Sequence, residues 1–574
     1  MNAERLLQHY EQIADASDAI ARLRRFILDL AVRGKLVPQN PADEPASELL
    51  KRIAAEKARL VDSGEIKTEK PIKQAFKSEE KYCLPTLWLW ADLQAVCLSI
   101  TDGDHLPPPK ADKGVPFLVI GDVRDKTINY DCDRYVGRAY YEKLDHIRRP
   151  RKGDILYTLV GSFGIPVPVQ DNREFCVQRH IGILRPSEIP SVRFLTYTLE
   201  SNLVFNQAEK FATGIAQKTV PLAGLRAIQI PLPPLAEQHR IVAKVDELMA
   251  LCDTLEAART ERETKRDRLA AASLARLNTP DPETFPDDAR FALDALPALT
   301  ARPDQIKQLR QTILNLAVRG KLVPQDAAEE PVKELLRRIE ADRQMVRRKV
   351  ETEVAAKSGP FDLPGGWMWT TIGSVCSKTG SGSTPRGGKE VYVDHGIPFL
   401  RSQNVHDDGL RLNDVAYIAP EVHLRMAGTA VKASDLLLNI TGGSMGRCCR
   451  VPDQFGEANI SQHVAIIRPV ISIMAHYLHC LVLSPYFQAF IFDEQTGAGR
   501  GGLPKNRMDQ IAVPLPPLAE QHRIVSKVDE LMALCDQLET SLTSADGTRK
   551  KLLDALLAEA LAPVDAEKLR EAAE

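Results

Sequence analysis

The chain contains one long segment twice, and this repetition constrains its fold more than any other feature. Residues 231–256 read PLPPLAEQHRIVAKVDELMALCDTLE and residues 514–539 read PLPPLAEQHRIVSKVDELMALCDQLE, so the two copies differ at only two positions. A second pair, LRRFILDLAVRGKLVPQ at 23–39 and LRQTILNLAVRGKLVPQ at 309–325, is separated by nearly the same interval. We therefore expect a pseudo-two-fold internal repeat, in which one architecture occurs twice.

The stretches between the repeated segments hardly match each other. Residues 82–230 and 364–513 are short β-like runs separated by Gly, Pro, Asp and Asn, with some helix. A faint correspondence survives between PFLVIGDV (from Pro116) and PFLRSQNV (from Pro398), and between VQRHIGILRP (from Val177) and ISQHVAIIRP (from Ile460). We predict one α+β fold that carries different surface chemistry in its two copies. Two near-identical surfaces and two divergent ones suggest two copies of one partner and two different targets.

The helix that follows each PLPPLAEQ string carries apolar residues at alternating intervals of four and three, as a coiled coil requires. The seam comprises Ile241, Val245, Leu248, Cys252 and Leu255 in the first copy and Ile524, Val528, Leu531, Cys535 and Leu538 in the second. The prolines before the helix lock φ and lack amide donors, which predicts a stiff extended strap. A Pro- and Asp-rich linker, residues 278–303, follows the first helix.

These features divide the chain into five regions: a helical region 1–81, a variable domain 82–230, a central region 231–363 with a long helix and linker, a second variable domain 364–513, and a C-terminal helical region 514–574. Two Trp-x-Trp pairs, Trp88/Trp90 and Trp367/Trp369, begin the variable domains. Alternate spacing puts both rings of a pair on one face of a strand. They could stack on bases, but their occurrence at one place in both domains favours a packing anchor.

Composition excludes several classes of protein. The net charge of −2 is not that of a protein that holds nucleic acid by bulk charge, so any DNA binding must use local basic patches. No apolar run approaches the ~18 residues that a membrane span needs. The N-terminus is charged rather than signal-like, and the ten cysteines include no CxxC. We expect a cytoplasmic protein that does not contact a membrane.

The sequence contains no convincing catalytic constellation. The loop Gly380–Lys389 has a spacing one residue off that of a phosphate loop, and Glu390 stands where a magnesium-binding hydroxyl should be. His476, His479 and Cys480 lie in an apolar helical run without companion ligands, so packing is the better interpretation than metal binding. We expect no enzymatic activity, metal or cofactor in this chain.

Four features together resemble the specificity subunit of type I restriction-modification systems. They are LAVRGKLVPQ after a helix, LP-x-x-W-x-W, the strap and helix PLPPLAEQHRIVxKVDELMALCD, and the occurrence of all three twice around two variable domains. The strings Ile100–His105 and Gly382–Pro385 look like the starts of target-recognition domains in that family. The resemblance covers essentially the whole chain.

The resemblance implies two globular target-recognition domains separated by two long helices that form an antiparallel coiled coil. Each domain would recognise one half of an asymmetric, split site on double-stranded DNA. The repeats would dock two methyltransferase subunits that transfer a methyl group from S-adenosylmethionine to adenine N6. A further restriction subunit, with ATP and magnesium, would join in a system that also cuts DNA; these cofactors would all reside on partner subunits.

Reading bases requires bidentate donors, Arg or Lys for guanine and Asn or Gln for adenine, and phosphates require basic groups or loop amides. Such residues in the first variable domain are Arg148, Arg149, Arg151, Lys152, Gln178, Arg179 and Lys218. In the second they are Arg401, Gln403, Asn404, Thr441, Ser444, Arg447, Arg500, Lys505 and Arg507. Asp102 and Asp104 could accept from cytosine N4, although a turn around Gly103 is the simpler interpretation.

Two other functions compete with this one. An autonomous methyltransferase or nuclease would need a cofactor loop and a catalytic motif, which the sequence lacks. A scaffold that pairs two identical proteins without touching DNA is compatible with the near-zero net charge, but it does not explain why the variable domains diverged while the repeats stayed fixed.

Overall fold

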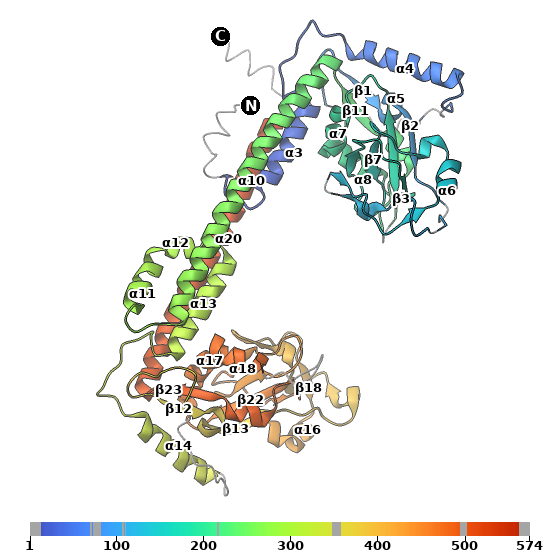
Figure 1. Cartoon of the computed structure of the whole chain (residues 1–574). Coiled ribbons are helices and arrows are strands. Elements are labelled where there is room, and N and C mark those ends of the chain that lie inside the picture. The colour runs from blue at the N-terminus through green and yellow to red at the C-terminus, as the bar shows by residue number, and fades with distance from the viewer. Residues whose placement is uncertain are drawn as a thin grey trace. The chain divides into compact units, whose positions relative to one another are not determined.

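A computed structural model describes residues 13–68, 72, 82–105, 108–109, 111–124, 126–214, 217–346, 358–493 and 502–561. The chain divides into two compact units, which we call unit 1 (residues 1–261 and 546–574) and unit 2 (residues 262–545). Two helices of 44 residues, α10 (Leu235–Asn278) and α20 (Leu518–Leu561), cross this division (Figure 1). Each gives its first part to one unit and its last part to the other.

Unit 1 begins with two amphipathic helices, α3 (Ala19–Val32) and α4 (Ala46–Asp62), and continues into the first variable domain. The strands of that domain are β1 (Leu89–Asp92), β2 (Cys97–Asp102), β3 (Val115–Leu118), β4 (Val123–Arg124), β5 (Thr127–Ile128), β6 (Tyr135–Val136), β7 (Ile155–Thr158), β8 (Pro166–Pro168), β9 (Cys176–Val177), β10 (Ile181–Pro186) and β11 (Gln229–Leu232). Its helices are α5 (Leu93–Val96), α6 (Arg138–Lys143), α7 (Val192–Glu200), α8 (Asn202–Phe211) and α9 (Leu222–Ala227).

Unit 2 repeats this order after the linker helices α11 (Phe285–Asp294) and α12 (Leu296–Leu299), with α13 (Pro303–Val318) and α14 (Val332–Val346) in place of α3 and α4. Its strands are β12 (Met368–Thr371), β13 (Cys376–Ser381), β14 (Tyr392–Val393), β15 (Ile397–Leu400), β16 (Val405–His406), β17 (Gly409–Leu410), β18 (Ala416–Ile418), β19 (Leu436–Asn439), β20 (Cys448–Arg450), β21 (Asn459–Ile460), β22 (Val464–Pro469) and β23 (Ala512–Leu515). Its helices are α15 (Ile372–Val375), α16 (Pro420–Arg425), α17 (Ala475–Leu483), α18 (Pro485–Asp493) and α19 (Lys505–Gln510).

The sheets of the two variable domains correspond, except that the smaller sheet of unit 2 has one additional strand, β14. A four-stranded antiparallel sheet has the order β2-β10-β7-β8 in unit 1 and β13-β22-β19-β20 in unit 2. A smaller sheet, β6-β3-β9 or β14-β18-β15-β21, contains one parallel pair in each case. The mixed helix-and-sheet fold and the internal repeat predicted from the sequence are therefore both present.

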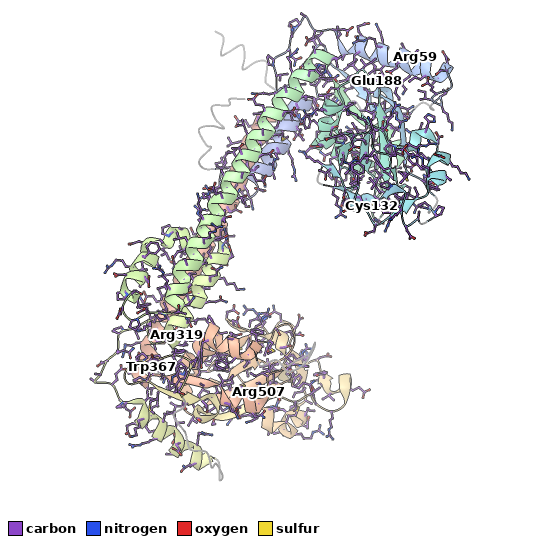
Figure 2. All side chains as sticks on the ribbon, viewed as in Figure 1. Arg59, Cys132, Glu188, Arg319, Trp367 and Arg507 are labelled. Carbon is purple, nitrogen blue, oxygen red and sulfur yellow. The ribbon has the colours of Figure 1, made fainter. Side chains whose placement is uncertain are left out.

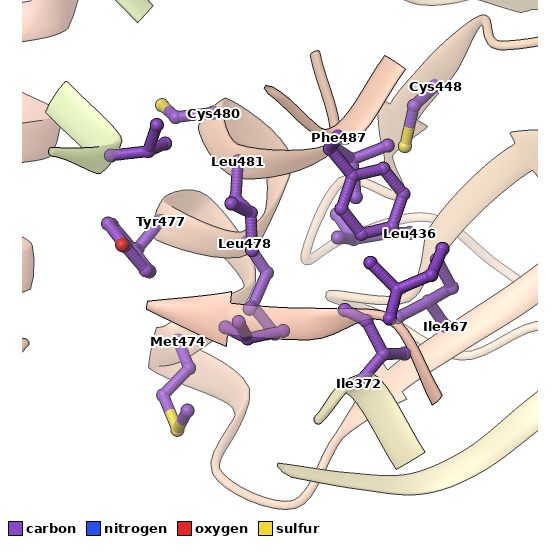
Figure 3. Close-up of a cluster of buried hydrophobic side chains, with 14 of the residues drawn as sticks. Ile372, Leu436, Cys448, Ile467, Met474, Tyr477, Leu478, Cys480, Leu481 and Phe487 are labelled. Carbon is purple, nitrogen blue, oxygen red and sulfur yellow. The ribbon is translucent and has the colours of Figure 1, made fainter. Parts of the chain in front are cut away.

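In each unit, one hydrophobic core contains side chains of the variable domain and of the first part of a long helix, α10 in unit 1 and α20 in unit 2. In unit 2, Leu478 and Leu481 of α17 lie among Leu436 and Ile467 of the four-stranded sheet (Figure 3). His479 is also packed here, where its Nε2 lies 2.9 Å from the carbonyl oxygen of Cys448. Burial lowers the pKa of His479, so this imidazole is a neutral packing group, in agreement with the sequence interpretation.

The seam residues of the long helices are buried, but within their own units. Ile241, Val245 and Cys252 belong to a core that also contains Ile27 and Leu28 of α3 together with variable-domain side chains. The last seam residue of that copy, Leu255, is 39% exposed. The heptad pattern correctly predicted a buried face, but the assignment of this face to pairing between the long helices is wrong for these positions. The antiparallel coiled coil itself stays a prediction.

The second seam behaves in the same way. Ile524, Val528 and Cys535 share the core of unit 2 with Ile313 and Leu314 of α13. Leu531 and Leu538 pack against the same core and are partly buried. Each unit therefore uses its apolar helix face to hold α3 or α13 and the variable domain together.

The last part of each long helix completes the unit that it enters. In unit 1, Leu553 and Leu556 pack against Ile13, Ala16 and Ala19. The corresponding part of α10 in unit 2 buries Ala270, Leu274 and Leu277 against Ala292 and Leu299.

A buried carboxylate joins three segments in unit 1. Glu237, in the first turn of α10, accepts hydrogen bonds from Gln39 Nε2 at 2.7 Å and from Trp88 Nε1 at 2.9 Å. Burial raises the pKa of Glu237, while the two donors and the positive end of the helix dipole favour its charged form. Trp88 is thus a packing anchor, as its repeated position suggested.

Unit 2 contains the same arrangement atom for atom. Glu520 accepts from Gln325 Nε2 at 2.7 Å and from Trp367 Nε1 at 2.9 Å, and burial raises its pKa as well. Nearby, the guanidinium carbon of Arg319 lies 4.4 Å from the centroid of the Phe361 ring; Figure 2 labels Trp367 and Arg319. We call the two sets of hydrogen bonds the Trp–Glu–Gln clamps.

The glycine of the LAVRGKLVPQ motif fits against the segment that carries the clamp tryptophan. Gly34 has φ +66°, and a Cβ built on it would lie 2.5 Å from Cγ of Pro85. Gly320 has φ +64°, and its Cβ would lie 2.4 Å from Cγ of Pro364. Both the left-handed backbone and the close approach require glycine, which explains why the motif is unchanged in both copies.

We predict that Glu237→Gln lowers the free energy of unfolding by about 1–3 kcal/mol, because a side-chain amide places its own NH₂ against one of the two donors and leaves that donor without an acceptor. Chemical denaturation of the full-length chain measures the effect. Glu520→Gln should cause a loss of the same size. Glu247→Gln is the matched control, since Glu247 lies on the same helix but is exposed and pairs only with Lys244. Equal losses for the clamp and control variants would contradict the clamp.

Candidate nucleic-acid interface

The first basic cluster predicted from the sequence lies beside residues 102–104, and Arg148 of this cluster contacts all three of them. Arg148 Nη1 donates to the carbonyl oxygen of Gly103 at 3.0 Å, and the guanidinium lies 3.8 Å from Asp102 Oδ1 and 3.6 Å from Asp104 Oδ1. Tyr140 Oη donates to the other oxygen of Asp104. Arg148 is therefore engaged within the domain. Asp102 ends strand β2 and Asp104 forms an isolated bridge with Gln178, so the segment is extended and the turn interpretation is wrong.

The neighbouring predicted contacts differ in how free their side chains are. Arg149 is tied down, because its guanidinium donates to the carbonyl oxygens of Glu142 and Leu144 at 2.6 Å. Arg151 and Lys152 are exposed on the loop before β7. Lys218 is exposed and pairs with Glu209 at 2.8 Å.

In unit 2, burial removes one candidate. Asn404 is 1% exposed, its Oδ1 accepts from the backbone N–H of Arg401, and its Nδ2 donates to the carbonyl oxygen of Arg411. Both ends of the amide are used inside the domain, so the assignment of Asn404 to a base contact is wrong for this structure. Arg401 itself is half-buried and donates to the carbonyl oxygen of Asp414.

The other candidates of unit 2 have varied surroundings. Gln403, Arg447, Lys505 and Arg507 are exposed, and Figure 2 labels Arg507. Lys505 pairs with Asp509, Ser444 lies within hydrogen-bond distance of Asn439, and Thr441 Oγ1 lies 2.7 Å from His463 Nδ1. Arg500 lies outside the described residues. Contact of these residues with DNA stays a prediction.

Three backbone segments converge in the first variable domain next to Gln178 and Arg179. The turn Gln178–Ile181, which we call turn A, is closed by a hydrogen bond from Ile181 N to Gln178 O at 2.9 Å. Gly103 packs onto its start so closely that a Cβ would lie 1.9 Å from the carbonyl oxygen of Val177. The segment that follows β7 contacts the end of turn A, where Leu159 N donates to His180 O at 2.9 Å.

A cavity of about 1060 Å³ opens beside turn A. Gln178 and Arg179 line it together with Asp104, His105 and Tyr135. Gln178 and Arg179, which were both predicted from the sequence, therefore line the same cavity as Asp104. The hollow contains acceptor and donor groups of both signs, a pattern that suits recognition of polar edges.

The equivalent turn of the second variable domain, Ser461–Val464, is called turn B. It is closed by a bond from Val464 N to Ser461 O at 3.0 Å. A Cβ on Gly382 would lie 2.0 Å from the carbonyl oxygen of Ile460. The sequence analysis did not single out Gln462 and His463 of this turn, although the paired strings VQRHIGILRP and ISQHVAIIRP align them with Arg179 and His180.

The repeated helices also present a nearly identical exposed face, opposite the buried seam, which differs only at Ala243/Ser526 and Thr254/Gln537. Leu251 is 54% exposed and its counterpart Leu534 is 47% exposed. Other pairs on this face are Ala236/Ala519, His239/His522, Glu247/Glu530 and Ala250/Ala533. We call it the repeated face. Of the seam residues predicted to dock a partner, Ile241, Val245, Ile524 and Val528 are buried in the cores, whereas the repeated face is exposed.

Among the described residues, no helix combines the length and the apolar character that crossing a membrane demands. Within the same residues, no group of three or more His, Cys, Asp and Glu side chains is arranged to hold a metal ion.

Comparison with known proteins identifies the family. The model of the type I restriction modification DNA specificity domain matches residues 109–263 and 364–545, which is more than half of the chain. The specificity subunit of the type I restriction enzyme EcoAI from Escherichia coli is 29% identical, with 94% of this chain and 93% of that protein covered. The EcoEI specificity subunit from Escherichia coli is 31% identical, with 94% of each chain covered.

A solved structure shares the fold. A chain from a study of complex assembly and conformational transition of the type I R-M system superposes with a TM-score of 0.50 at 20% identity, with 84% of this chain and 99% of that chain covered. Both variable domains match the family model, and the similarity to the specificity subunits extends through the repeated helices. The chain therefore belongs to the DNA specificity subunits of type I restriction-modification systems.

Proposed function

We propose that the chain recognises an asymmetric, bipartite DNA site and docks two adenine-N6 methyltransferase subunits. The observation that carries the proposal is that one fold occurs twice with a nearly unchanged helix surface and different side chains at its turns. As a specificity subunit, the chain is the non-catalytic, DNA-recognising member of its complex. S-adenosylmethionine would reside on the methyltransferase subunits, and ATP with magnesium on a restriction subunit where one is present.

The two half-sites would be read by the two variable domains. Turn A presents Arg179 and turn B presents Gln462 on backbones that are bonded in the same way, so the two domains offer different donors in the same geometry. Because the side chains differ, the two half-sites should differ in sequence. The near-zero net charge of the whole chain requires that these local groups, with those of a partner, supply the attraction to DNA.

The two methyltransferase subunits would bind the repeated face, one on each copy. Two identical surfaces in one chain bind two identical partners without requiring symmetry in the DNA. Leu251 and Leu534 are large apolar residues of this face, and they are exposed at the same position of both copies. The proposed complex would act on chromosomal DNA in the cytoplasm.

The alternative, a scaffold that pairs two proteins without reading DNA, makes a different prediction. It leaves turns A and B without a task and is excluded by salt-dependent binding to one DNA sequence.

We predict that deletion of this gene abolishes N6-methyladenine at one asymmetric, split motif with a fixed unspecified spacer. A genome-wide methylation map of cells with the gene intact and deleted measures this, and a catalytically inactivated methyltransferase partner is the positive control. An unchanged map in an otherwise active system would contradict the proposed function.

We also predict that four residues inserted into both long helices, after Thr260 and after Ser544, lengthen the spacer by about two base pairs without changing either half-site. Four helical residues add about 6 Å, and DNA rises about 3.4 Å per base pair. The methylation map of the variant gives the spacer directly. The same insertion in the linker at Pro282, outside the helices, is the control and should leave the spacer unchanged. An unchanged spacer in the helix variant would refute the separator role.

For partner docking, we predict that Leu251→Glu and Leu534→Glu each remove one methyltransferase subunit from the complex and that the double variant removes both. Each substitution buries a charge in a desolvated contact, which costs about 2 kcal/mol or more at the centre of an interface. Native mass spectrometry of the co-purified complex counts the subunits. Leu293→Glu is the control, because Leu293 is 70% exposed on α11 and lies outside the repeated face. Two subunits retained by the double variant would rule out this face.

A further inference from the structure

Turns A and B are held by matching backbone hydrogen bonds, which makes them equivalent platforms. In turn A, Gln178 N donates to Leu118 O at 2.9 Å and Gly103 N donates to Ile181 O at 3.2 Å. In turn B, the same bonds run from Ser461 N to Leu400 O at 2.9 Å and from Gly382 N to Val464 O at 2.9 Å. A side chain at a given position of either turn therefore starts from the same place in the fold.

The second residue of each turn differs in chemistry, whereas the third is histidine in both. Arg179 and Gln462 occupy the second position, and both are exposed. Among the described residues, neither pairs with a carboxylate, in contrast to the engaged Arg148 of the same region. Each turn thus holds one exposed hydrogen-bonding side chain that, within the described part of the chain, forms no ion pair, an arrangement suited to reading a ligand rather than to stabilising the domain.

The histidine of each turn lies against the variable side chain. Arg179 Nε donates to His180 Nε2 over a long 3.4 Å, and Gln462 Nε2 lies 3.5 Å from His463 Nε2. Because arginine is always a donor, His180 Nε2 is the acceptor in turn A. In turn B the other ring nitrogen, Nδ1 of His463, lies 2.7 Å from Thr441 Oγ1. Burial and the adjacent Arg179 lower the pKa of His180, which is consistent with a neutral ring.

We propose that Arg179 and Gln462 are the paired specificity residues of the two domains, with Arg179 contacting guanine in one half-site and Gln462 contacting adenine in the other. Arginine matches guanine O6 and N7 with two donors, and the glutamine amide matches adenine N6 and N7. His180 and His463 are positioning residues that hold these side chains at the tip of the turn. This inference rests on the proposed function, because it names the bases that the two domains read.

The cavity beside turn A supports the assignment for the first domain. Arg179 and Gln178 line it from one side and Tyr135 lines it as well, so a base edge that reaches Arg179 also meets other hydrogen-bonding groups. Asp104 lines the same cavity. The equivalent position to Asp104 in the second domain is Ser383, whose N donates to Ile460 O as Asp104 N donates to Val177 O. The two reading surfaces thus differ at a second matched position.

The test exchanges the two residues in the intact system. Arg179→Gln and Gln462→Arg are introduced separately into the chromosomal gene, and N6-methyladenine is mapped across the genome. Arg179→Gln should replace guanine by adenine at one position of one half-site, with the other half-site and the spacer unchanged. Gln462→Arg should replace adenine by guanine at one position of the other half-site. Arg138→Gln, an exposed arginine of the same domain that pairs with Glu142 and Glu174, should leave the motif unaltered.

A binding assay keeps the test decisive where methylation is lost. The assembled complex with each variant is titrated against duplexes that differ at single base pairs of the mapped site. The inference expects the preference at one position to fall by about 10- to 100-fold, with preferences elsewhere retained. A uniform weakening that leaves every preference intact, or a motif unchanged in both exchange variants, would overturn it. A map with no methylation that depends on this gene, even for the unaltered chain, is instead a failure of the proposed function.

The histidines are tested with a pair of variants. His180→Phe removes the acceptor for Arg179 and should relax the base preference at the same position that Arg179→Gln changes. His180→Gln retains an acceptor oxygen and should restore most of the preference. Relaxation at a different position, or equal effects of the two variants, would refute a positioning role for His180.

Discussion

Each unit depends on a carboxylate that is removed from water at the start of a long helix. A buried carboxylate without partners is costly, so its position is stable only when donors reach it from elsewhere in the fold. In unit 1 those donors come from the LAVRGKLVPQ motif and from Trp88, the residue before the first strand of the variable domain, and Glu237 itself lies in the first turn of the helix that leaves that domain. Helix, strand and motif are thereby fixed at one point. This explains why the strings that contain the Gln, the Trp and the Glu are all repeated. Loss of any one of them would leave a buried polar group without a hydrogen-bond partner.

The constant framework extends into the variable domains and explains how they diverged without unfolding. Asp154 and Arg185 form a doubly hydrogen-bonded, buried ion pair, with both N···O distances 2.9 Å. Asp435 and Arg468 form the same pair in unit 2 at 2.6 and 2.7 Å. These pairs and the four-stranded sheets hold the backbone, so the exposed tips of the turns are free to change. At those tips the two domains carry different hydrogen-bonding side chains, Arg179 and Gln462.

The sequence predicted the features that depend on local pattern and repetition. The duplicated architecture, the mixed helix-and-sheet domains and the packing role of Trp88 and Trp367 all follow from residues whose spacing can be read directly. It failed where the outcome depends on contacts between distant segments. A heptad seam shows that Ile241 and Val245 are buried, but periodicity does not say against what, and the variable domain with α3 takes the place of a second long helix.

The polar side chains show the same limit. Arg148 and Asn404 carry the groups that read DNA elsewhere, and nothing in their local sequence reveals that Gly103 and Arg411 satisfy them inside the fold. Gln462 was missed for the opposite reason, because its neighbours contain no basic cluster. Alignment of the two variable domains on the turn that follows β9 or β21 is the signal that would have found it.

The pairing of the first and last strands of each variable domain has a consequence for how such proteins change. β1 pairs with β11 so that Trp90 lies opposite Pro231, and β12 pairs with β23 so that Trp369 lies opposite Pro514. The two ends of a variable domain are therefore hydrogen-bonded neighbours, whatever the length of chain between them. A foreign domain spliced in at these strands would arrive with its ends already at the correct separation. One variable domain could therefore be exchanged for another while the repeated helices and the paired end strands keep their geometry.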